Sequence, residues 1–143
     1  IFYNSFMNVR SLLYSLVFLS GFIFPKVQFE ENKILNVDEA FIINSRILKN
    51  KIFISWEIEP GYYLYKKSIS ITAGKNVLKH EYDTKNELTI YDDFFGESLI
   101  FKDKLKINAN LPSIDLNKTH DIQIIYQGCA EDKYCYPKRI KSL

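Results

Sequence analysis

The sequence contains few of the residues that build metal, haem or phosphate sites. Its 143 residues include two cysteines, two histidines, five glycines and four prolines. His80 and His120 lie far apart and have no ligand-like spacing to the cysteines, so we expect no zinc site. The cysteines do not form the C-x-x-C-H sequence of haem attachment, and no glycine-rich phosphate loop is present. We therefore expect neither a metal nor an organic cofactor.

The charges are balanced, which argues against a nucleic-acid-binding protein. Lysine and arginine total 19, aspartate and glutamate total 17, and the net charge is +2. Arg10 and Lys26 are the only charged residues before position 27, so the remainder carries 17 of each sign. The sequence has no basic block interleaved with aromatic residues. We expect no nucleic-acid partner.

The first 26 residues have the layout of a secretory signal. Met7 is an eligible initiator, Arg10 supplies a short basic region, and residues 11–25 carry no charge. This apolar run is shorter than the ~20 residues of a membrane-spanning helix. We interpret residues 1–26 as a signal segment and residues 27–143 as the exported domain, with an uncleaved anchor or a buried helix as alternatives. Export places the cysteines in an oxidising compartment.

Beyond residue 40, short runs rich in β-branched and aromatic residues alternate with turn signals, a pattern that predicts an all-β sandwich. No amphipathic helix longer than three turns is predicted. The expected strands cover residues 40–48, 52–59, 62–65, 68–73, 77–82, 99–101, 105–111 and 121–127. One strand alternates cleanly, and its expected core residues are Ile52, Ile54, Trp56 and Ile58.

The two cysteines lie in one short segment near the C-terminus, with five residues between them. An apolar run ending at Tyr126 predicts a strand, residues 128–134 predict a turn or short loop, and the return arm begins at Cys135. Across such a hairpin Cys129 and Cys135 can approach to the ~4.4–6.8 Å Cα separation of a disulfide. Closing a loop of about seven residues contributes only ~2.4 kcal/mol. A reactive and a structural disulfide are therefore equally compatible with the spacing.

Three ordered motifs carry a family resemblance. They are Y-Q-G-C-A-x4-C-Y-P at residues 126–137, G-Y-Y-L-Y-K-K at 61–67 and D-D-F-F-G at 92–96. Together they resemble the N-terminal periplasmic domain of the thiol:disulfide interchange protein DsbD, over residues 37–141. The resemblance implies an immunoglobulin-like β-sandwich in the periplasm whose cysteine pair is redox-active.

The resemblance also implies roles for individual residues. Cys129 and Cys135 are the expected catalytic residues, with Cys135 forming the mixed disulfide and Cys129 resolving it. The expected cap loop over the disulfide comprises Asp92, Asp93, Phe94, Phe95 and Gly96. In that loop Phe94 matches the covering ring and Gly96 a hinge, while Phe95 stands where the family often has tyrosine. Tyr63 and Tyr65 are expected to border and shape the site.

Each of these motifs also has an ordinary structural interpretation. Asp92 to Gly96 is equally a turn whose phenylalanines tuck into the core. Tyr63 and Tyr65 alternate with Tyr62 and Leu64, so one pair is expected to face inward and the other outward. Acidic residues near a thiol raise its pKa, so Glu131 and Asp132 predict a pair that waits for an incoming thiolate. The alternative is that these acids are merely solvated loop charges.

Two functions follow for testing. In the first, which the resemblance implies, a thioredoxin-like donor domain and a membrane electron-transfer domain of the same system supply electrons through the Cys129–Cys135 disulfide. The domain then acts as part of a protein-disulfide reductase, passing electrons to a periplasmic disulfide isomerase or a cytochrome c maturation thioredoxin-like protein. In the second, it is a non-catalytic immunoglobulin-like binding module with an inert hairpin disulfide. A reduction potential separates them, because structural disulfides lie below about −300 mV.

Overall fold

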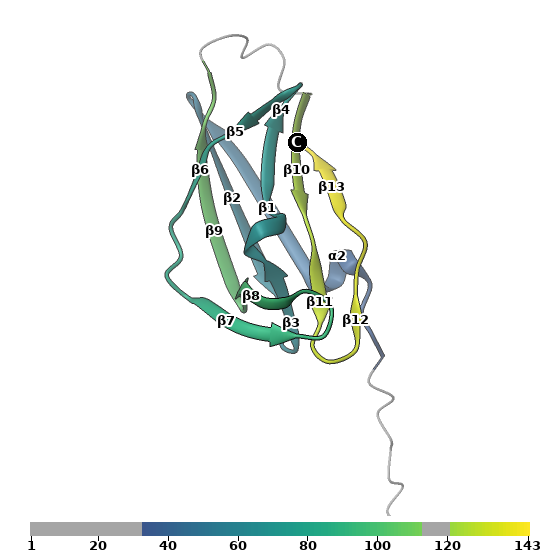
Figure 1. The fold of residues 1–143 in the computed structure, drawn as a ribbon. Helices are drawn as coiled ribbons and strands as arrows, with labels where there is room; N and C mark the ends of the chain where they lie inside the picture. The colour runs from purple at the N-terminus through teal and green to yellow at the C-terminus, as the bar shows by residue number, and fades with distance from the viewer. Residues whose placement is uncertain (1–32, 113–120) are drawn as a thin grey trace, which may run out of the picture. The chain divides into compact units, whose positions relative to one another are not determined.

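The computed structural model describes residues 33–112 and 121–143, and these residues form mainly β-strands (Figure 1). The proposed signal segment, residues 1–26, and residues 27–32 and 113–120 lie outside the described residues. Within the described part of the chain, no helix is long and apolar enough to cross a membrane.

The first layer of the fold is a four-stranded antiparallel sheet in the order β1-β2-β9-β6. Its strands are β1 (Phe41–Leu48), β2 (Lys51–Ile58), β9 (Lys104–Asn110) and β6 (His80–Tyr82). The alternation predicted for β2 is confirmed, because Ile52, Ile54, Trp56 and Ile58 are all buried. The intervening residues of β2 are more exposed, so one face of this sheet forms the core.

The second layer contains two sheets, and the chain passes between them where one strand ends and the next begins. One has the order β13-β10-β4-β5 and the other the order β12-β11-β3-β8-β7. The strands of the first are β13 (Arg139–Ser142), β10 (Ile122–Tyr126), β4 (Ser70–Ala73) and β5 (Asn76–Leu78). Those of the second are β12 (Tyr134–Cys135), β11 (Gly128–Ala130), β3 (Tyr62–Tyr65), β8 (Gly96–Phe101) and β7 (Glu87–Asp92).

The interruption between these two sheets is bridged by the Ser68 hydroxyl and by one backbone bond, in which the Tyr65 amide donates to the Gln127 carbonyl at 3.0 Å. The chain leaves β3 through a 3-10 turn, η2 (Lys66–Ser68), and leaves β10 through Gln127. The Ser68 hydroxyl donates to the Tyr65 carbonyl at 2.7 Å and accepts from the Gln127 amide at 2.9 Å. These bonds satisfy backbone groups that the interrupted ladder leaves unpaired. The strands therefore continue from one sheet into the other across this point.

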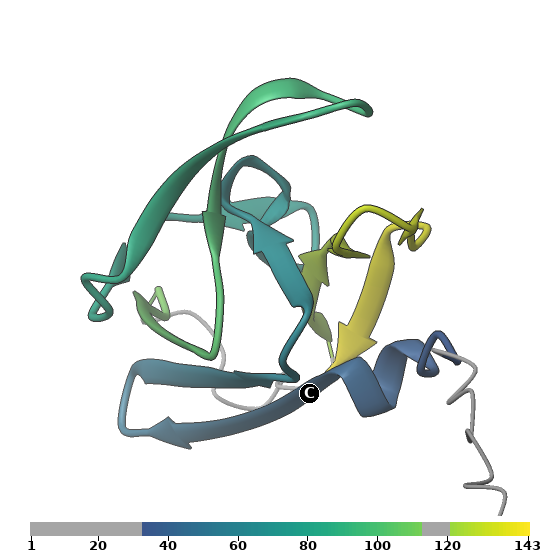
Figure 2. The ribbon, with the colours of Figure 1, turned by 90° about the horizontal axis from the view of Figure 1, so that it is seen from below.

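The two layers face one another across an apolar core, which confirms the predicted β-sandwich (Figures 1 and 2). Trp56 of the first layer and Tyr126 of the second meet edge to face, with ring centroids 5.8 Å apart. Both side chains are fully buried. Aromatic pairs of this geometry add to the stabilisation that burial of their area provides.

A short N-terminal segment packs against the strands that surround the cysteines. It contains the helix α2 (Val37–Ala40), whose last residue had been assigned to the first expected strand. Leu35 is held on both sides of its backbone: its amide donates to the Tyr62 hydroxyl at 2.8 Å, and its carbonyl accepts from the Tyr136 hydroxyl at 2.5 Å. An ion pair between Arg139 and Asp38, at 2.7 Å, adds a second link.

Three parts of the strand prediction are wrong. Residues 77–82 do not form one strand, because the chain passes at Lys79 from β5 in one layer to β6 in the other. Strand β7 was not predicted; as an edge strand it buries little of its length and carries a weak apolar signal. Residues 128–130 form strand β11 rather than a loop, so the turn of the cysteine hairpin is shorter than expected.

Candidate functional site: a disulfide on the outer face of strand β3

Strand β3 has two differently used faces, and the candidate site is built on one of them. All four of its residues, Tyr62 to Tyr65, are buried. Tyr62 and Leu64 belong to the main core, whereas Tyr63 and Tyr65 form a second cluster with Ile100 and Cys129. The two pairs do face opposite ways, but the pair that faces away from the main core, Tyr63 and Tyr65, is covered as well. Its cover comes from the disulfide on β11 and from the β7–β8 hairpin, which lies on the far side from β1 and β2 in Figure 2.

The disulfide joins two cysteines that are direct partners across neighbouring strands. Cys129 of β11 pairs with Cys135 of β12, and their sulfurs are bonded, as the sequence predicts for an oxidising compartment. The Cα atoms are 4.0 Å apart. Cys129 is 0% exposed, whereas Cys135 is only partly buried. The two sulfurs thus differ in how accessible they are to an incoming thiol.

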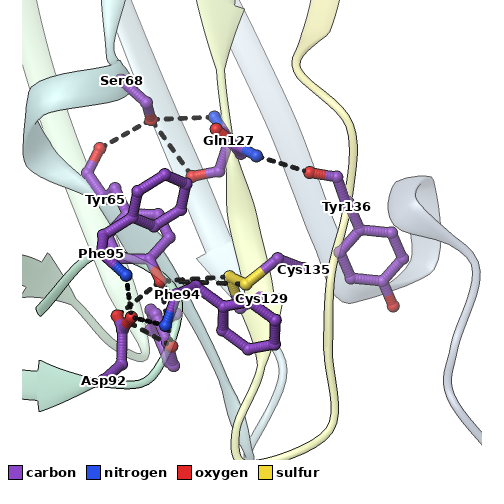
Figure 3. The surroundings of a disulfide bond; sticks show 10 residues. Tyr65, Ser68, Asp92, Phe94, Phe95, Gln127, Cys129, Cys135 and Tyr136 are labelled. Carbon is purple, nitrogen blue, oxygen red and sulfur yellow. Dashed lines mark hydrogen bonds between the residues drawn. A yellow bond between two sulfur atoms is a disulfide. The ribbon is translucent and has the colours of Figure 1, made fainter.

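The hydroxyl group of Tyr65 lies against both sulfur atoms and a carboxylate (Figure 3). Its oxygen is 3.4 Å from Cys129 Sγ and 3.8 Å from Cys135 Sγ. The hydroxyl donates to Asp92 Oδ2 at 2.5 Å, and the Tyr63 hydroxyl lies 3.4 Å from the same oxygen. The Asp92 carboxylate therefore binds the hydroxyls of both tyrosines on the β3 face that the disulfide covers.

Asp92 also organises the loop that follows β7. Its Oδ1 accepts hydrogen bonds from the amides of Phe94 and Phe95, at 2.9 and 2.7 Å. Burial by itself raises the pKa of Asp92, but the hydrogen bonds from Tyr65, the two amides and Tyr63 outweigh it and lower the pKa. The carboxylate is thus held ionised. It ties the expected cap loop to β3.

The two tyrosine hydroxyls of the site are held in their neutral form. Burial, followed by the hydrogen bond to Asp92, raises the pKa of Tyr65 far above its ordinary value. Burial is also the largest cause of the raised pKa of Tyr63, and the charge of Asp92 contributes. Both groups therefore act as hydrogen-bonding hydroxyls at neutral pH rather than as phenolates.

The cap loop (residues 92–96) is a tight hairpin connection whose two aromatic rings have different surroundings. Asp92 and Gly96 are cross-strand partners, and Gly96 takes a left-handed φ of +69°, which glycine adopts without strain. Phe95 is 43% exposed, and its ring meets Tyr65 edge to face at 4.9 Å. Phe94 is 56% exposed, and Figure 3 shows its ring on the side of the disulfide. Asp93 is exposed at the loop's outer edge.

The acidic residues predicted near the cysteines gather beside the loop. Asp93, Glu131 and Asp132 line a hollow of about 290 Å³ together with Tyr63 and Phe94. One of the acids is neutralised, because Lys102 donates to Glu131 at 2.8 Å. Residues 33–112 and 121–143 contain no group of three or more histidine, cysteine or acidic side chains placed to hold a metal ion.

Sequence reasoning missed the residues that hold the arm bearing Cys135. The Tyr136 amide donates to the Gly128 carbonyl at 3.0 Å, and its carbonyl accepts from Gln127 Nε2 at 2.9 Å. Its hydroxyl reaches Leu35, far away in the sequence. Gln127 could have been suspected from its place beside the cysteine motif. Nothing in the sequence signalled the contact with Leu35, which depends on the fold.

Comparison with known proteins identifies the family. The family model for the N-terminal domain of the thiol:disulfide interchange protein DsbD matches residues 31–142. The chain belongs to this family. DsbD of Vibrio cholerae is 36% identical over 107 residues, which cover 75% of this chain and 17% of the relative. DsbD of Photorhabdus laumondii is 34% identical over 142 residues, covering 92% and 23%. The matches thus span about a fifth of the length of these relatives.

Solved structures from Neisseria meningitidis share the fold. The DsbD N-terminal domain in its reduced form has a TM-score of 0.63 at 19% identity, over 77% of this chain and 87% of that one. A complex between the DsbD and PilB N-terminal domains matches with a TM-score of 0.61 at 20% identity, over 77% and 85% of the respective chains. The DsbD N-terminal domain of this chain is an immunoglobulin-like β-sandwich, as predicted.

Proposed function

We propose that this DsbD N-terminal domain is a thiol:disulfide exchange module in which Cys135 is the sulfur that partners attack. The observation that carries the proposal is the asymmetry of the disulfide, with Cys129 fully buried and Cys135 partly exposed. A thiolate must approach the sulfur it attacks, so access decides which cysteine forms the mixed disulfide.

The exchange runs through two balanced steps. A donor thiolate bonds to Cys135 Sγ, the Cys129–Cys135 bond breaks, and its electron pair leaves on Cys129. The donor's second thiol then displaces Cys135, which leaves this domain as a dithiol and the donor as a disulfide. In the onward reaction, the Cys135 thiolate attacks an oxidised partner, and Cys129 resolves that mixed disulfide.

Tyr65 and Asp92 act on the protonation of Cys129. Because the Tyr65 hydroxyl donates to Asp92, its oxygen presents lone pairs to the Cys129 sulfur 3.4 Å away. That arrangement favours an S–H donor over a thiolate, and burial disfavours the anion as well. Cys129 therefore takes up a proton after it leaves. The resulting dithiol resists adventitious oxidation until a partner engages Cys135.

The disulfide is not required as a staple, which argues against the inert binding module. The arm that carries Cys135 is fastened by the backbone and hydroxyl bonds of Tyr136 and by Gln127. The disulfide itself adds only ~2.4 kcal/mol for a loop of about seven residues. We expect circular dichroism to show the same β-sandwich with and without reductant. Unfolding on reduction would favour a structural disulfide, as would a reduction potential below about −300 mV.

The proposed partners are a thioredoxin-like donor domain and a membrane electron-transfer domain of the same system. The proposed acceptors are a disulfide isomerase and a cytochrome c maturation thioredoxin-like protein, all in the periplasm, reached through a signal at residues 1–26. Two findings support such exchange: the family is a thiol:disulfide interchange family, and the similar Neisseria domain forms a complex with a PilB N-terminal domain. No metal or organic cofactor takes part.

A trapping experiment tests the assignment of the two cysteines. A thioredoxin that lacks its resolving cysteine is converted with dithiobis(nitrobenzoate) to its thionitrobenzoate mixed disulfide and then mixed with each single-cysteine variant, whose thiol displaces thionitrobenzoate. The Cys129→Ser variant should form a stable mixed disulfide through Cys135, detected by non-reducing electrophoresis and mass. The Cys135→Ser variant should form little, because Cys129 is buried. Equal trapping by both variants, or by neither, would overturn the assignment.

A further inference from the structure

A lysine outside the cap loop contacts one of the loop's two aromatic rings. Lys67, in the η2 turn directly after β3, places its ammonium group 4.3 Å from the centroid of the Phe95 ring. The same ammonium is 5.7 Å from the centroid of Tyr65, whose ring the Phe95 ring meets edge to face. The cation thus lies within cation–π range of both members of an aromatic pair.

We propose that Lys67 is a positioning residue that keeps the cap loop closed by its contact with Phe95, and so sets how often a thiol reaches the disulfide. The proposal rests on the proposed exchange function. It assigns the two phenylalanines different tasks: Phe95 anchors the loop, and Phe94, which lines the hollow with Tyr63 and Glu131, obstructs the approach to the disulfide.

The surroundings of the two neighbouring lysines differ in a way that supports this assignment. Lys66 forms an ion pair with Glu87 and lies 5.1 Å from the ring of Tyr82. Lys67 takes part in none of the ion pairs between the described residues, so no carboxylate among them draws its ammonium away from the ring. Aromatic faces are its only strong partners there.

Movement of Phe95 is coupled to movement of Phe94. Both amides bind the same Asp92 oxygen, and only three residues separate Asp92 from its cross-strand partner Gly96. The loop is too short for one ring to leave while the other keeps its place. We therefore expect that loss of the Lys67 contact frees the loop as a unit. The hydrogen bonds from the Phe94 and Phe95 amides to Asp92 then break together.

The expected size of the effect is modest and measurable. An exposed cation–π contact of ordinary strength corresponds to about a two- to fivefold change in an equilibrium constant. Lys67→Gln should raise the open population of the loop by that factor. Lys67→Arg should restore the closed population, because a guanidinium also stacks on aromatic rings. Lys66→Gln is the matched control and should leave the loop unchanged.

Two measurements on the folded domain test the proposal. Hydrogen exchange at the Phe94 and Phe95 amides reports loop opening directly. Reduction by tris(hydroxypropyl)phosphine reports access to the disulfide, and because this reductant is uncharged, the charge of Lys67 does not attract it. Phe95→Leu, which keeps Lys67 but removes the ring, is combined with Lys67→Gln in a double-mutant cycle.

The outcomes are distinct. Support requires that Lys67→Gln speed both exchange and reduction about two- to fivefold, with no further effect in the Phe95→Leu background. Unchanged amide exchange, or additive effects of the two substitutions, would overturn the contact as the cause. Faster exchange with unchanged reduction would overturn the control of access. That result would not contradict the proposed thiol:disulfide exchange, because the trapping experiment at Cys135 tests the exchange separately.

Discussion

The two faces of strand β3 present tyrosines in the same backbone setting, and yet they do different things. On the core face, the Tyr62 hydroxyl accepts a bond from the Leu35 amide, a neutral partner that fixes the N-terminal segment. On the site face, the hydroxyls of Tyr63 and Tyr65 converge on Asp92, and Tyr65 also lies against the sulfurs. The residue type and its burial are shared, so the group opposite each hydroxyl decides its role.

The largest expected effect comes from adding a side chain at Gly128, where β11 pairs closely with β3. This residue is the partner of Leu64, and a Cβ added to it would lie 2.3 Å from Phe41 Cζ and 2.6 Å from the Tyr63 carbonyl oxygen. We expect Gly128→Ala to destabilise the domain by about 1–3 kcal/mol or more, measured by urea unfolding. Gly74→Ala is the comparison for backbone strain alone, because nothing lies within 4 Å of its added Cβ but its φ of +59° disfavours any side chain. Equal losses would mean that the contact at Gly128 relaxes easily.

The next effect comes from removing one tyrosine hydroxyl from each face of β3 in turn. Tyr65→Phe removes the oxygen that lies 3.4 Å from Cys129 Sγ and that, in the proposed function, accepts the Cys129 S–H of the reduced domain. The loss of one hydrogen bond, about 0.5–1.5 kcal/mol, should shift the equilibrium with glutathione about two- to tenfold toward the disulfide. Tyr62→Phe should instead lower the free energy of unfolding by a similar amount and leave the redox equilibrium unchanged. If both variants shift the redox equilibrium equally, the two faces are not separate in function.

A smaller effect is expected from the ring beside the disulfide. Phe94 is 56% exposed, so its contact with the domain stabilises the closed loop by about 1 kcal/mol or less. Phe94→Ala should therefore speed reduction by dithiothreitol about fivefold or less, measured by stopped flow, with little change in fold. Tyr91→Ala, at a residue that is 82% exposed on β7, is the control. Identical rates for Phe94→Ala and the native domain would show that Phe94 is not the shield.

The smallest effect is expected from pH. The folded pKa of Asp92 is lowered, so its contribution is fully present above the unfolded value of about 3.9 and is lost as pH falls through the folded value. Signals of the Phe94 and Phe95 amides should stay constant down to about pH 4 and move below it. Tyr65→Phe removes a donor to the carboxylate and should move this transition to higher pH, which an NMR titration checks.

The parts of the fold that were predictable are those whose signal is local. The alternation of β2 follows from its own residues, and it is confirmed by their burial. The aromatic run of β3 likewise indicated a strand, and the placement of both cysteines in one hairpin followed from their spacing. A period-two pattern or a tight spacing needs no knowledge of the rest of the chain.

The parts that were missed depend on segments remote in the sequence. The burial of Tyr63 and Tyr65 requires the hairpin at residues 87–101, and nothing in their own strand announces it. Gly128 and Ala130 have low β-propensity, so strand β11 forms because β3 lies beside it. The place of Lys67 over Phe95 depends on the η2 turn, whose hydrogen bonds involve Gln127.

The short length of β3 has a consequence for folding fidelity. A slip of one residue against β11 would exchange the two faces, turning Tyr63 and Tyr65 into the core and Tyr62 and Leu64 toward the sulfurs. The same slip disrupts the apolar packing of the core and moves the Tyr65 hydroxyl away from Cys129, so a shifted register cannot keep one without the other. A misaligned chain would thus lose the core packing of Tyr62 and Leu64 together with the contact between Tyr65 and the sulfurs.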